Sequence, residues 1–374
     1  MKRLEKKRLA VIGANAAITM LIDKAKEKGY ETHVFAWQCG DPGEKAADVF
    51  YPISIADKEK ILEICKTLQI CGVVSVTSDF AVNTVNYVAR NLGLVGNSER
   101  TDLTARNKYE MRRAFQAAGL YTPRFCQAGS DFQTHDVDGF QYPLIVKPTD
   151  RWSSKGVTRV DSPNELSEAV RRAVQESFND KAIIEEFMEG PEYSAECICY
   201  RGERRVLTFT RKETTGNPHY IETGHVQPAG IPEKMQESIR GVILKALEAL
   251  DIQNGAAHAE FRIMPDGQIG IIEIGARMGG DSIGTDLTSI STGMDYLGMV
   301  VDIACGQKPC FDLVTDPTPV RVKFIICESD KEIYERLCRD HPESIVRAGD
   351  FNDDFDKAVV DSSTRHGYYI EKMV

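Results

Sequence analysis

The sequence predicts a mixed fold, in which an N-terminal α/β domain with a parallel sheet is followed by α+β regions with antiparallel sheets. Three observations lead to this prediction. Apolar runs alternate with amphipathic segments over residues 8–92, a pattern typical of βαβ units. From Tyr121-Thr122-Pro123 onward, short strands and turns replace that alternation. Further along, Asp266-Gly267 lies between two apolar runs and predicts a β-hairpin.

The N-terminal region is expected to contain repeated βαβ units. Strands are predicted at 8–12, 31–37 and 72–75, and helices at 18–28, 58–68 and 81–92. Such alternation implies a parallel sheet with helices on both faces. The turn after the first strand, Gly13-Ala14-Asn15-Ala16-Ala17, lacks the full GxGxxG pattern, so a dinucleotide-binding fingerprint is not supported.

A helix at 107–119 leads into a small α+β unit that we expect to be a separate lobe. Its strands are predicted at 142–147, 156–160 and 182–186, and its helix at 163–177. The remaining elements are strands at 193–200 and 203–210, a polar loop at 214–220, a helix at 232–250, the hairpin at 257–277, a helix at 296–305, a strand at 322–327 and a helix at 331–340.

Composition is that of an ordinary globular protein, with 42% hydrophobic and 27% charged residues. No run of about 18 apolar residues predicts a transmembrane helix, and no signal-peptide core follows the basic N-terminus, so we expect a cytoplasmic protein. A net charge of −10 without a basic cluster argues against nucleic acid as a partner. The ten cysteines lack paired CxxC spacing, so neither zinc nor disulfides are expected. Several lie in apolar runs and are predicted to be reduced core residues: Cys65, Cys71, Cys197, Cys199 and Cys327.

The hairpin at 257–277 sets two carboxylates against each other. If a two-residue turn closes Pro265 against Gln268, Glu260 lies directly opposite Glu273. Like charges placed about 5 Å apart in this way destabilise a sheet. A divalent cation removes the conflict, because Mg²⁺ commonly takes one or two carboxylates together with substrate phosphates. The alternative is that Arg262, on the same face as Glu260, neutralises one glutamate while the other is solvated.

Lys147 ends a predicted strand and faces the serine-containing turn Trp152-Ser153-Ser154-Lys155-Gly156-Val157. Small residues there would let backbone N–H groups and hydroxyls surround phosphates, with lysines adding positive charge. A solvated lysine at a strand end is the simpler alternative.

An acidic and apolar segment follows at 185–192. The extended stretch Glu185-Glu186-Phe187-Met188 could bond the edge of a purine through its backbone, with Phe187 and Met188 lining the ring. Glu192 could then accept ribose hydroxyls. Taken alone, the segment fits an acidic surface linker better.

The order and spacing of these pieces resemble the ATP-grasp superfamily of ATP-dependent carboxylate ligases over nearly the whole chain. The resemblance implies an N-terminal α/β domain at 1–107, a mobile lid lobe at 108–188 and a C-terminal antiparallel-sheet lobe at 189–374. It also implies ATP and Mg²⁺, or Mn²⁺, as cofactors. The residues that match the family's site are Lys108 and Lys147 for phosphates, Ser153, Ser154, Lys155, Gly156 and Val157 for the closing loop, Glu185, Glu186, Phe187 and Met188 for the adenine hinge, Glu192 for ribose, Glu260 and Glu273 for the metal, and Arg277 for the transferring phosphate.

There are two departures from the family pattern. The phosphate loop has fewer glycines than many family members show, with Trp152 at its base. The family most often has asparagine two residues after the second acidic ligand, and Gly275 stands there instead. A metal contact from that side chain is therefore missing, so either water replaces it or one of the two metal sites is weakened.

Residues 222–229 and 273–280 look like the branch of ATP-grasp ligases that make dipeptides, including carnosine-synthase-like enzymes. The likeness implies catalytic or substrate-facing roles for Glu222, His225 and Arg277, although an ordinary loop histidine is an equally favoured interpretation of His225. Asp281 stands where some dipeptide ligases carry a bulky aromatic residue. An acidic residue there favours a cationic or amine-bearing substrate group.

The resemblance thus implies a ligase that activates a carboxylate as an acyl-phosphate and joins it to an amine, releasing ADP and phosphate. Its partners would be small-molecule carboxylate and amine substrates, with no membrane, and a homodimer is compatible with the sequence. The alternatives are a bicarbonate-activating enzyme of the biotin-carboxylase, carbamoyl-phosphate or purine-biosynthesis type, a nucleotide-binding protein without catalysis, and a phosphotransferase.

Overall fold

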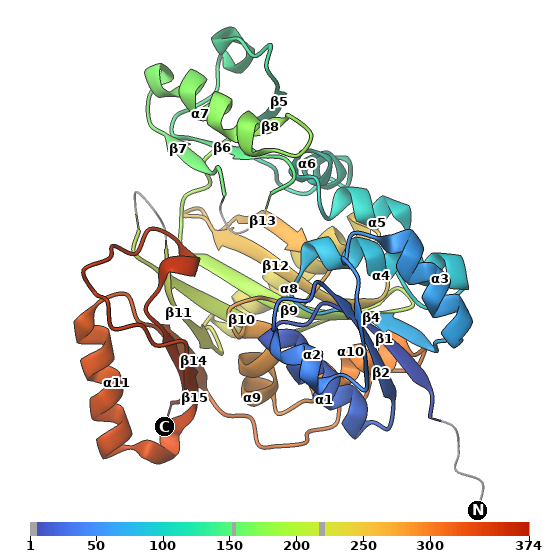
Figure 1. The fold of residues 1–374 in the computed structure, drawn as a ribbon. Helices are drawn as coiled ribbons and strands as arrows, with labels where there is room; N and C mark the ends of the chain where they lie inside the picture. Colours follow the sequence, from blue (N-terminus) through green and yellow to red (C-terminus); the bar gives the residue numbers. More distant parts are fainter. Residues whose placement is uncertain (1–5, 152–154, 217–220, 374) are drawn as a thin grey trace, which may run out of the picture.

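A computed structural model describes residues 6–151, 155–216 and 221–373 of the chain. It contains three sheets, which lie in the N-terminal, middle and C-terminal parts of the sequence (Figure 1). The first sheet is parallel and the other two are antiparallel. The predicted combination of an α/β domain with antiparallel lobes is confirmed, whereas the domain bounds at 107 and 188 remain predictions.

The parallel sheet has the order β3 (Val49–Pro52), β2 (Glu31–Ala36), β1 (Arg8–Ile12) and β4 (Gly72–Val74). Its central strand is a continuous apolar run because both faces are covered: Leu9 and Val11 pack into one core, and Ala10 and Ile12 into the other. The sequence did not reveal β3, a short, half-exposed edge strand. The accompanying helices are α1 (Ala16–Glu27), α2 (Pro42–Ala46), α3 (Lys58–Leu68), α4 (Asp79–Leu92) and α5 (Glu99–Thr104).

The middle lobe stands above the rest of the molecule in Figure 1 and holds the second sheet. Its strands have the order β5 (Phe125–Ala128), β8 (Ala182–Glu186), β6 (Leu144–Pro148) and β7 (Thr158–Val160). The helix α7 (Pro163–Glu176) covers this sheet with side chains at helical spacing, namely Leu166, Ala169, Val170 and Ala173. The 3₁₀ turn η1 (Thr134–Val137) completes the lobe, whereas α6 (Lys108–Ala117) packs Met111 and Phe115 into the core of the third sheet.

The third sheet has eight strands in the order β13, β12, β9, β10, β11, β14, β16, β15. In chain order, the strands of this sheet and the helices between them are β9 (Glu192–Tyr200), β10 (Glu203–Thr214), β11 (Glu222–Gln227), α8 (Glu233–Ala249), β12 (Gly255–Ile263), β13 (Ile269–Gly275), the π-helix η2 (Ile283–Leu287), α9 (Thr288–Thr292), α10 (Tyr296–Ala304), β14 (Val320–Phe324), α11 (Glu328–Asp340), η3 (Pro342–Ser344), β15 (Ile345–Gly349), η4 (Ser362–Thr364) and β16 (Tyr368–Lys372).

The third sheet lies between two helices. Ala195 and Cys197 of β9 share a core with α8, whereas Ile198 of the same strand shares a core with α10. The helix α10 also packs against β1 and α1, so one apolar core joins the C-terminal part of the chain to the parallel sheet. The strand expected at 322–327 ends earlier, at Phe324, and β11 was not expected as a strand.

None of the helices in the described parts of the chain is long and apolar enough to cross a membrane. All ten cysteines are free thiols. Cys65, Cys197 and Cys199 are buried and Cys71 is half-buried, but Cys327 is exposed, so its prediction as a core residue was wrong. It follows β14 after the strand has ended and directly precedes α11, where no sheet covers it.

Candidate active site

The hairpin of β12 and β13 places Glu260 directly opposite Glu273, as predicted. The turn itself differs from the prediction. Met264 rather than Pro265 pairs with Gln268, so the loop has three residues, Pro265 to Gly267, with Gly267 at φ +82°. A β-bulge next to the two glutamates shifts the register back, and the predicted pairing is restored.

Arg112 of α6 forms hydrogen bonds with the backbone of this bulge. Its guanidinium donates to the carbonyl oxygens of Ile271 and Ile272 at 2.6 and 2.9 Å, and its Nε donates to Glu185 of β8. Arg112 is almost completely buried. One side chain thus connects the middle lobe to the strand that carries Glu273.

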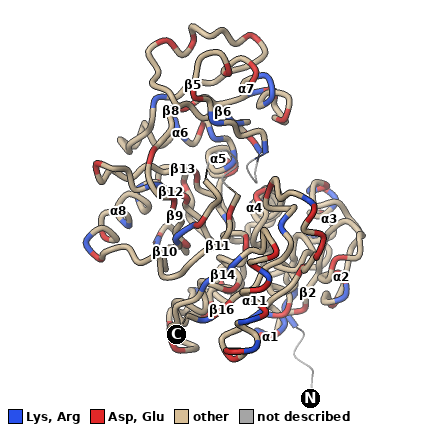
Figure 2. The backbone as a smooth tube through the Cα atoms, turned by 90° about the vertical axis from the view of Figure 1, so that its left-hand side faces the viewer, with Lys and Arg blue, Asp and Glu red and all other residues tan. Residues whose placement is uncertain are grey.

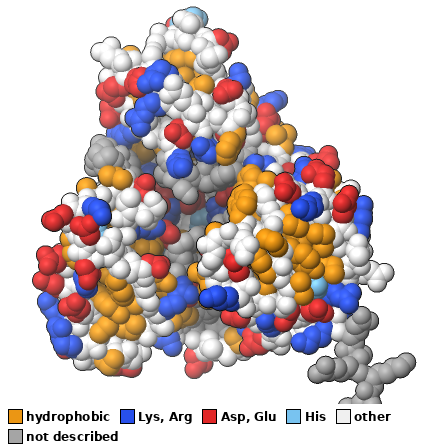
Figure 3. Space-filling model, viewed as in Figure 1, with side chains coloured by type: hydrophobic (Ala, Val, Ile, Leu, Met, Phe, Trp, Pro, Cys, Tyr) orange, Lys and Arg blue, Asp and Glu red, His pale blue; other side chains and the backbone are white. Residues whose placement is uncertain are grey.

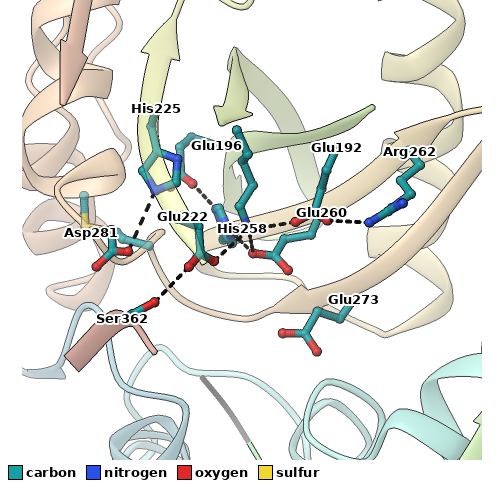
Figure 4. Close-up of polar contacts among 12 residues, drawn as sticks. Glu192, Glu196, Glu222, His225, His258, Glu260, Arg262, Glu273, Asp281 and Ser362 are labelled. Atoms are coloured by element: carbon teal, nitrogen blue, oxygen red, sulfur yellow. Dashed lines mark hydrogen bonds and ion pairs between the residues drawn. The ribbon is translucent and has the colours of Figure 1, made fainter. Parts of the chain in front are cut away.

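Lys212 of β10 lies among three carboxylates. Its Nζ is 2.8 Å from Glu260, 2.9 Å from Glu192 and 3.7 Å from Glu222. Burial alone lowers the pKa of Lys212, but the three glutamates outweigh it and hold the pKa well above the usual range. Lys212 therefore neutralises Glu260, a role that the alternative to a metal site gave to Arg262. Arg262 instead bonds Glu192 at 3.1 Å (Figure 4).

His258 supports Glu260 from the same strand. Its Nε2 lies 3.3 Å from Glu260, while its Nδ1 bonds the buried Glu196 of β9. Glu196 is fixed in turn by the hydroxyl of Tyr296 at 3.1 Å and the N–H of Gly279 at 3.0 Å. Burial alone lowers the pKa of His258, but Glu196 and Glu260 raise it to about 9.

Two lysines approach the acidic pair. Lys108, the first residue of α6, lies 3.0 Å from Glu273. Lys147 of β6 lies 2.6 Å from Glu185, and both are buried. Burial lowers the pKa of Lys147, whereas Glu185 opposes that effect. For Glu185, burial acts to raise the pKa, but Arg112 and Lys147 lower it to about 2.

Some backbone groups of the predicted adenine hinge at 185–188 already form hydrogen bonds within the protein. The N–H groups of Glu186 and Phe187 already donate to the carbonyl oxygens of Arg124 and Pro143. The ring of Phe187 lies below the guanidinium groups of Arg159 and Arg262, 4.6 and 4.7 Å from its centre. Met188 is buried against Gly270, where a Cβ would lie 2.4 Å from its sulfur.

Arg277 bonds Asp79 at 2.9 Å, which ties the end of the hairpin to the first residue of α4. Gly275 lies against this ion pair, because a Cβ there would be 3.0 Å from the Asp79 carboxylate and 3.2 Å from the Arg277 guanidinium. A side chain in that position would require the pair to move by a few tenths of an ångström. The ion pair thus gives a physical reason for the departure from the family pattern.

Residues of the C-terminal segment contact Glu222 and Asp281, two of the residues that the sequence placed on the substrate side. The hydroxyl of Ser362 donates to Glu222 at 2.8 Å (Figure 4). His225 is buried and lies 3.8 Å from Asp281, which also accepts from Arg365 at 2.9 and 3.0 Å. Burial acts to raise the pKa of Asp281, but His225 and Arg365 lower it to about 2.

Asp281 therefore carries a charge that Arg365 already compensates, contrary to the expectation of a free acidic group facing the substrate. Asp281 and Ser282 both have positive φ values, +50° and +64°, and a π-helix follows them. Non-glycine residues rarely adopt this conformation, and such strain tends to occur at functional sites.

The predicted closing loop is described only in part. Ser153 and Ser154 lie outside the described residues. Lys155 and Val157 are exposed, and Gly156 adopts φ +71° above Pro148. The molecule is hollowed where the middle lobe meets the two lower parts (Figure 3), and acidic and basic residues gather on β9 to β13 beneath that lobe (Figure 2).

The acidic pair suits a hard divalent cation only with help from other ligands. Within residues 6–151, 155–216 and 221–373, no group of three or more His, Cys, Asp or Glu side chains is arranged to hold a metal. Burial acts to raise the pKa values of Glu260 and Glu273, but neighbouring cations lower both, so the two carboxylates are ionised. Two ionised carboxylates fit Mg²⁺ when phosphate and water oxygens complete the coordination.

Sequence reasoning missed Lys212, Arg112, Asp79, Ser362 and Arg365. A signal existed for Lys212: Thr208 and Thr210 are buried at alternate positions of β10, and continuing the alternation would place Lys212 on the same face. Because the predicted strand ended at Thr210, Lys212 was not predicted to lie on that face. The others come from distant segments and had no local signal.

Comparison with known proteins identifies the fold and the domain. A family model described as the ATP-grasp domain matches residues 140–286. The chain is 26% identical over 279 residues to the alanine–anticapsin ligase of Bacillus subtilis (strain 168), an alignment that covers 67% of this chain. The chain spans only 58% of that relative's length.

Two solved structures resemble the whole chain. The L-amino acid ligase from Bacillus licheniformis has a TM-score of 0.81 and 25% identity, with 99% of this chain and 94% of that chain covered. Phosphoribosylglycinamide synthetase from Anaerococcus prevotii has a TM-score of 0.77 and 22% identity, with 98% and 94% covered. The predicted resemblance is confirmed: this chain contains an ATP-grasp domain and has the ATP-grasp fold.

Proposed function

We propose that this chain is an ATP-dependent ligase that activates the carboxylate of an amino acid as an acyl-phosphate and joins it to an amine. The observation that carries the proposal is the cluster of Glu260, Glu273, Lys108 and Lys147. These groups lie close enough for Lys108, Glu260 and Lys147 all to shift the pKa of Glu273. The likeness to an L-amino acid ligase and to an alanine–anticapsin ligase supports the same reaction class.

Lys108 and Lys147 are assigned to the phosphates of ATP. In the structure each lysine is held by a glutamate, Glu273 or Glu185, so both carry defined positions before a nucleotide binds. Residues 185–188 and Glu192 are assigned to the adenine and ribose, with Arg262 fixing Glu192. Mg²⁺ bound by Glu260 and Glu273 would offset the charge of the phosphate groups.

Arg277 is assigned to the acyl-phosphate. Its guanidinium would stabilise the negative charge that develops when the amine attacks, and Asp79 orients it. Exclusion of water from the site would protect the acyl-phosphate from hydrolysis. No side-chain nucleophile is required by this mechanism.

Glu222, His225 and Asp281 are assigned to the substrate side of the site. Because Arg365 compensates Asp281, we propose that this wall accepts neutral, polar substrate groups in preference to cationic ones. Among the described residues, the buried Nδ1 of His225 has no hydrogen-bond partner.

The test is phosphate and ADP release measured over a matrix of amino-acid pairs, with mass spectrometry of the products. We expect an amide product for at least one pair, and Glu273→Gln should abolish ADP release. The matched control is Glu248→Gln, an exposed glutamate on α8, which should retain full activity. Substantial turnover by Glu273→Gln would refute the metal assignment.

The same matrix separates the alternatives. ADP release that depends on bicarbonate and needs no amino acid would favour a bicarbonate-activating enzyme. A stable phosphorylated product would indicate a phosphotransferase. Tight ADP binding without turnover on any substrate would indicate a nucleotide-binding protein.

A further inference from the structure

Two cysteine thiols face each other where the parallel sheet meets the C-terminal part of the chain. Cys71 directly precedes β4, and Cys305 directly follows α10. Their Sγ atoms are 3.8 Å apart, although 234 positions separate them in the sequence. Both side chains are half-buried, and neither has a role in the proposed ligase reaction.

Close backbone packing holds the two thiols together. A Cβ built on Gly72 would lie 2.4 Å from the carbonyl oxygen of Ala304, so only glycine fits at that position. Gly72 and Ala304 are the chain neighbours of the two cysteines. The thiol contact is therefore fixed by the main chain and does not depend on two freely rotating surface side chains.

The two thiols differ chemically. A hydrogen bond from Cys305 outweighs burial and lowers the pKa of Cys71 to about 7, with Lys7 contributing. The same bond, together with burial, raises the pKa of Cys305. Near neutral pH a large fraction of Cys71 is thus a thiolate, the nucleophilic form, while Cys305 keeps its proton.

We propose that Cys71 and Cys305 are a modification site, at which a hydroperoxide converts the two thiols into a reversible disulfide. The thiolate of Cys71 attacks the terminal oxygen of the hydroperoxide, an S–O bond forms, the O–O bond breaks, and the departing alkoxide takes a proton to become an alcohol. The sulfur of Cys305 then attacks the sulfenic sulfur of Cys71. The S–S bond forms, the S–O bond breaks, and hydroxide leaves as water with the proton of Cys305. Overall, two thiols lose two electrons and the hydroperoxide gains them.

The disulfide would join two elements whose opposite ends reach the candidate site. Beyond β4 the chain reaches Asp79, which bonds Arg277, and α10 begins at Tyr296, which bonds Glu196. A cavity between these elements is lined by Val73 and Ala304 on one side and extends to Arg277. The crosslink would restrain the contact between these two elements. The inference does not depend on the ligase assignment, because its readouts are the thiols themselves.

The experiment uses the full chain, reduced, desalted and treated with tert-butyl hydroperoxide. Thiols are counted in denaturant, and linked peptides are mapped without reduction. We expect the loss of two thiols per chain, a peptide linking Cys71 to Cys305, and an upward shift in Tm that dithiothreitol reverses. Mapping on the unaltered chain does not require any variant to fold.

Variants test the order of the two steps. Cys305→Ser should trap a sulfenic acid on Cys71 that dimedone labels, whereas Cys71→Ser should give no label on Cys305. Cys310→Ser, which removes an exposed thiol elsewhere, should still form the link. A sulfenic acid without any 71–305 link in the unaltered chain, a link between two chains, or loss of two thiols in both Cys71→Ser and Cys305→Ser would overturn the proposal.

Discussion

Replacing Arg112 with methionine should destabilise the protein more than any exposed substitution on the same helix. Arg112→Met keeps the aliphatic part of the side chain and removes the guanidinium, whose carbon lies 5.9 Å from the centre of the Phe115 ring. The change leaves the buried Glu185 with Lys147 as its remaining partner and takes a donor from the carbonyl oxygens of Ile271 and Ile272.

The magnitude follows from these contacts. Removing one partner of a buried ion pair costs about 3–5 kcal/mol, and the lower end applies because Lys147 stays 2.6 Å from Glu185. Each carbonyl oxygen that loses its donor adds about 1 kcal/mol. The expected loss in the free energy of unfolding is about 5 kcal/mol. Arg112→Lys, which keeps the charge but not the planar set of donors, should lose less.

Urea unfolding at pH 7 measures the effect as a lower midpoint at an unchanged slope. Arg113→Met is the matched control. Arg113 is the next residue on α6, is exposed, and contacts Glu110 at 3.4 Å, so its loss should stay within about 0.5 kcal/mol. If Arg112→Met were no less stable than Arg113→Met, the reasoning that Arg112 holds Glu185 and the bulge would be refuted.

Three further predictions concern charge in the site. The pKa of His258 is raised from 6.5 to about 9, so protonated His258 stabilises the fold fully below pH 6.5, and this contribution of about 3 kcal/mol is lost as the pH rises through 9. His258→Gln should flatten that part of the pH–stability curve. An equally steep curve in the variant would contradict the assignment. Lys212→Met removes the cation that Glu192, Glu222 and Glu260 share, so added Mg²⁺ should raise the Tm of this variant more than that of the wild type or of the exposed control Lys234→Met; equal shifts would count against a cation site there. Arg365→Met frees the charge of Asp281 and should raise kcat/KM for cationic amino acids relative to neutral ones by about tenfold, an advantage that Asp281→Asn in the same chain should remove; an unchanged preference would show that Asp281 does not face the substrate.

Local patterns predicted the acidic pair well, because alternating side chains fix which residues share a face of a hairpin. They did not predict the three-residue loop or the bulge, two irregularities that shift the register in opposite directions and leave Glu260 opposite Glu273. The bulge depends on donors from Arg112, which lies about 160 positions earlier. Its position therefore follows from tertiary packing and not from the hairpin sequence.

Local sequence patterns also did not predict the charged partners of Arg277 and Asp281. Asp79 and Arg365 reach Arg277 and Asp281 from opposite ends of the chain, and no nearby pattern announces either contact. The sequence showed the acidic residue at 281 but not its partner. The predicted preference for a cationic substrate was the consequence.

Because α10 packs into the core of the parallel sheet, the N-terminal region is not a complete folding unit without it. Its residues Tyr296, Met299, Val300 and Ile303 fill the same core as Leu9, Val11 and Ile22 of the parallel sheet and α1. A fragment ending at residue 107 would expose that apolar face to water, and we expect it to aggregate or to need α10 added in trans. The parallel sheet looks like an independent domain in sequence, yet it completes its interior only after some 300 residues have been synthesised. Folding of the N-terminal region is therefore expected to finish late.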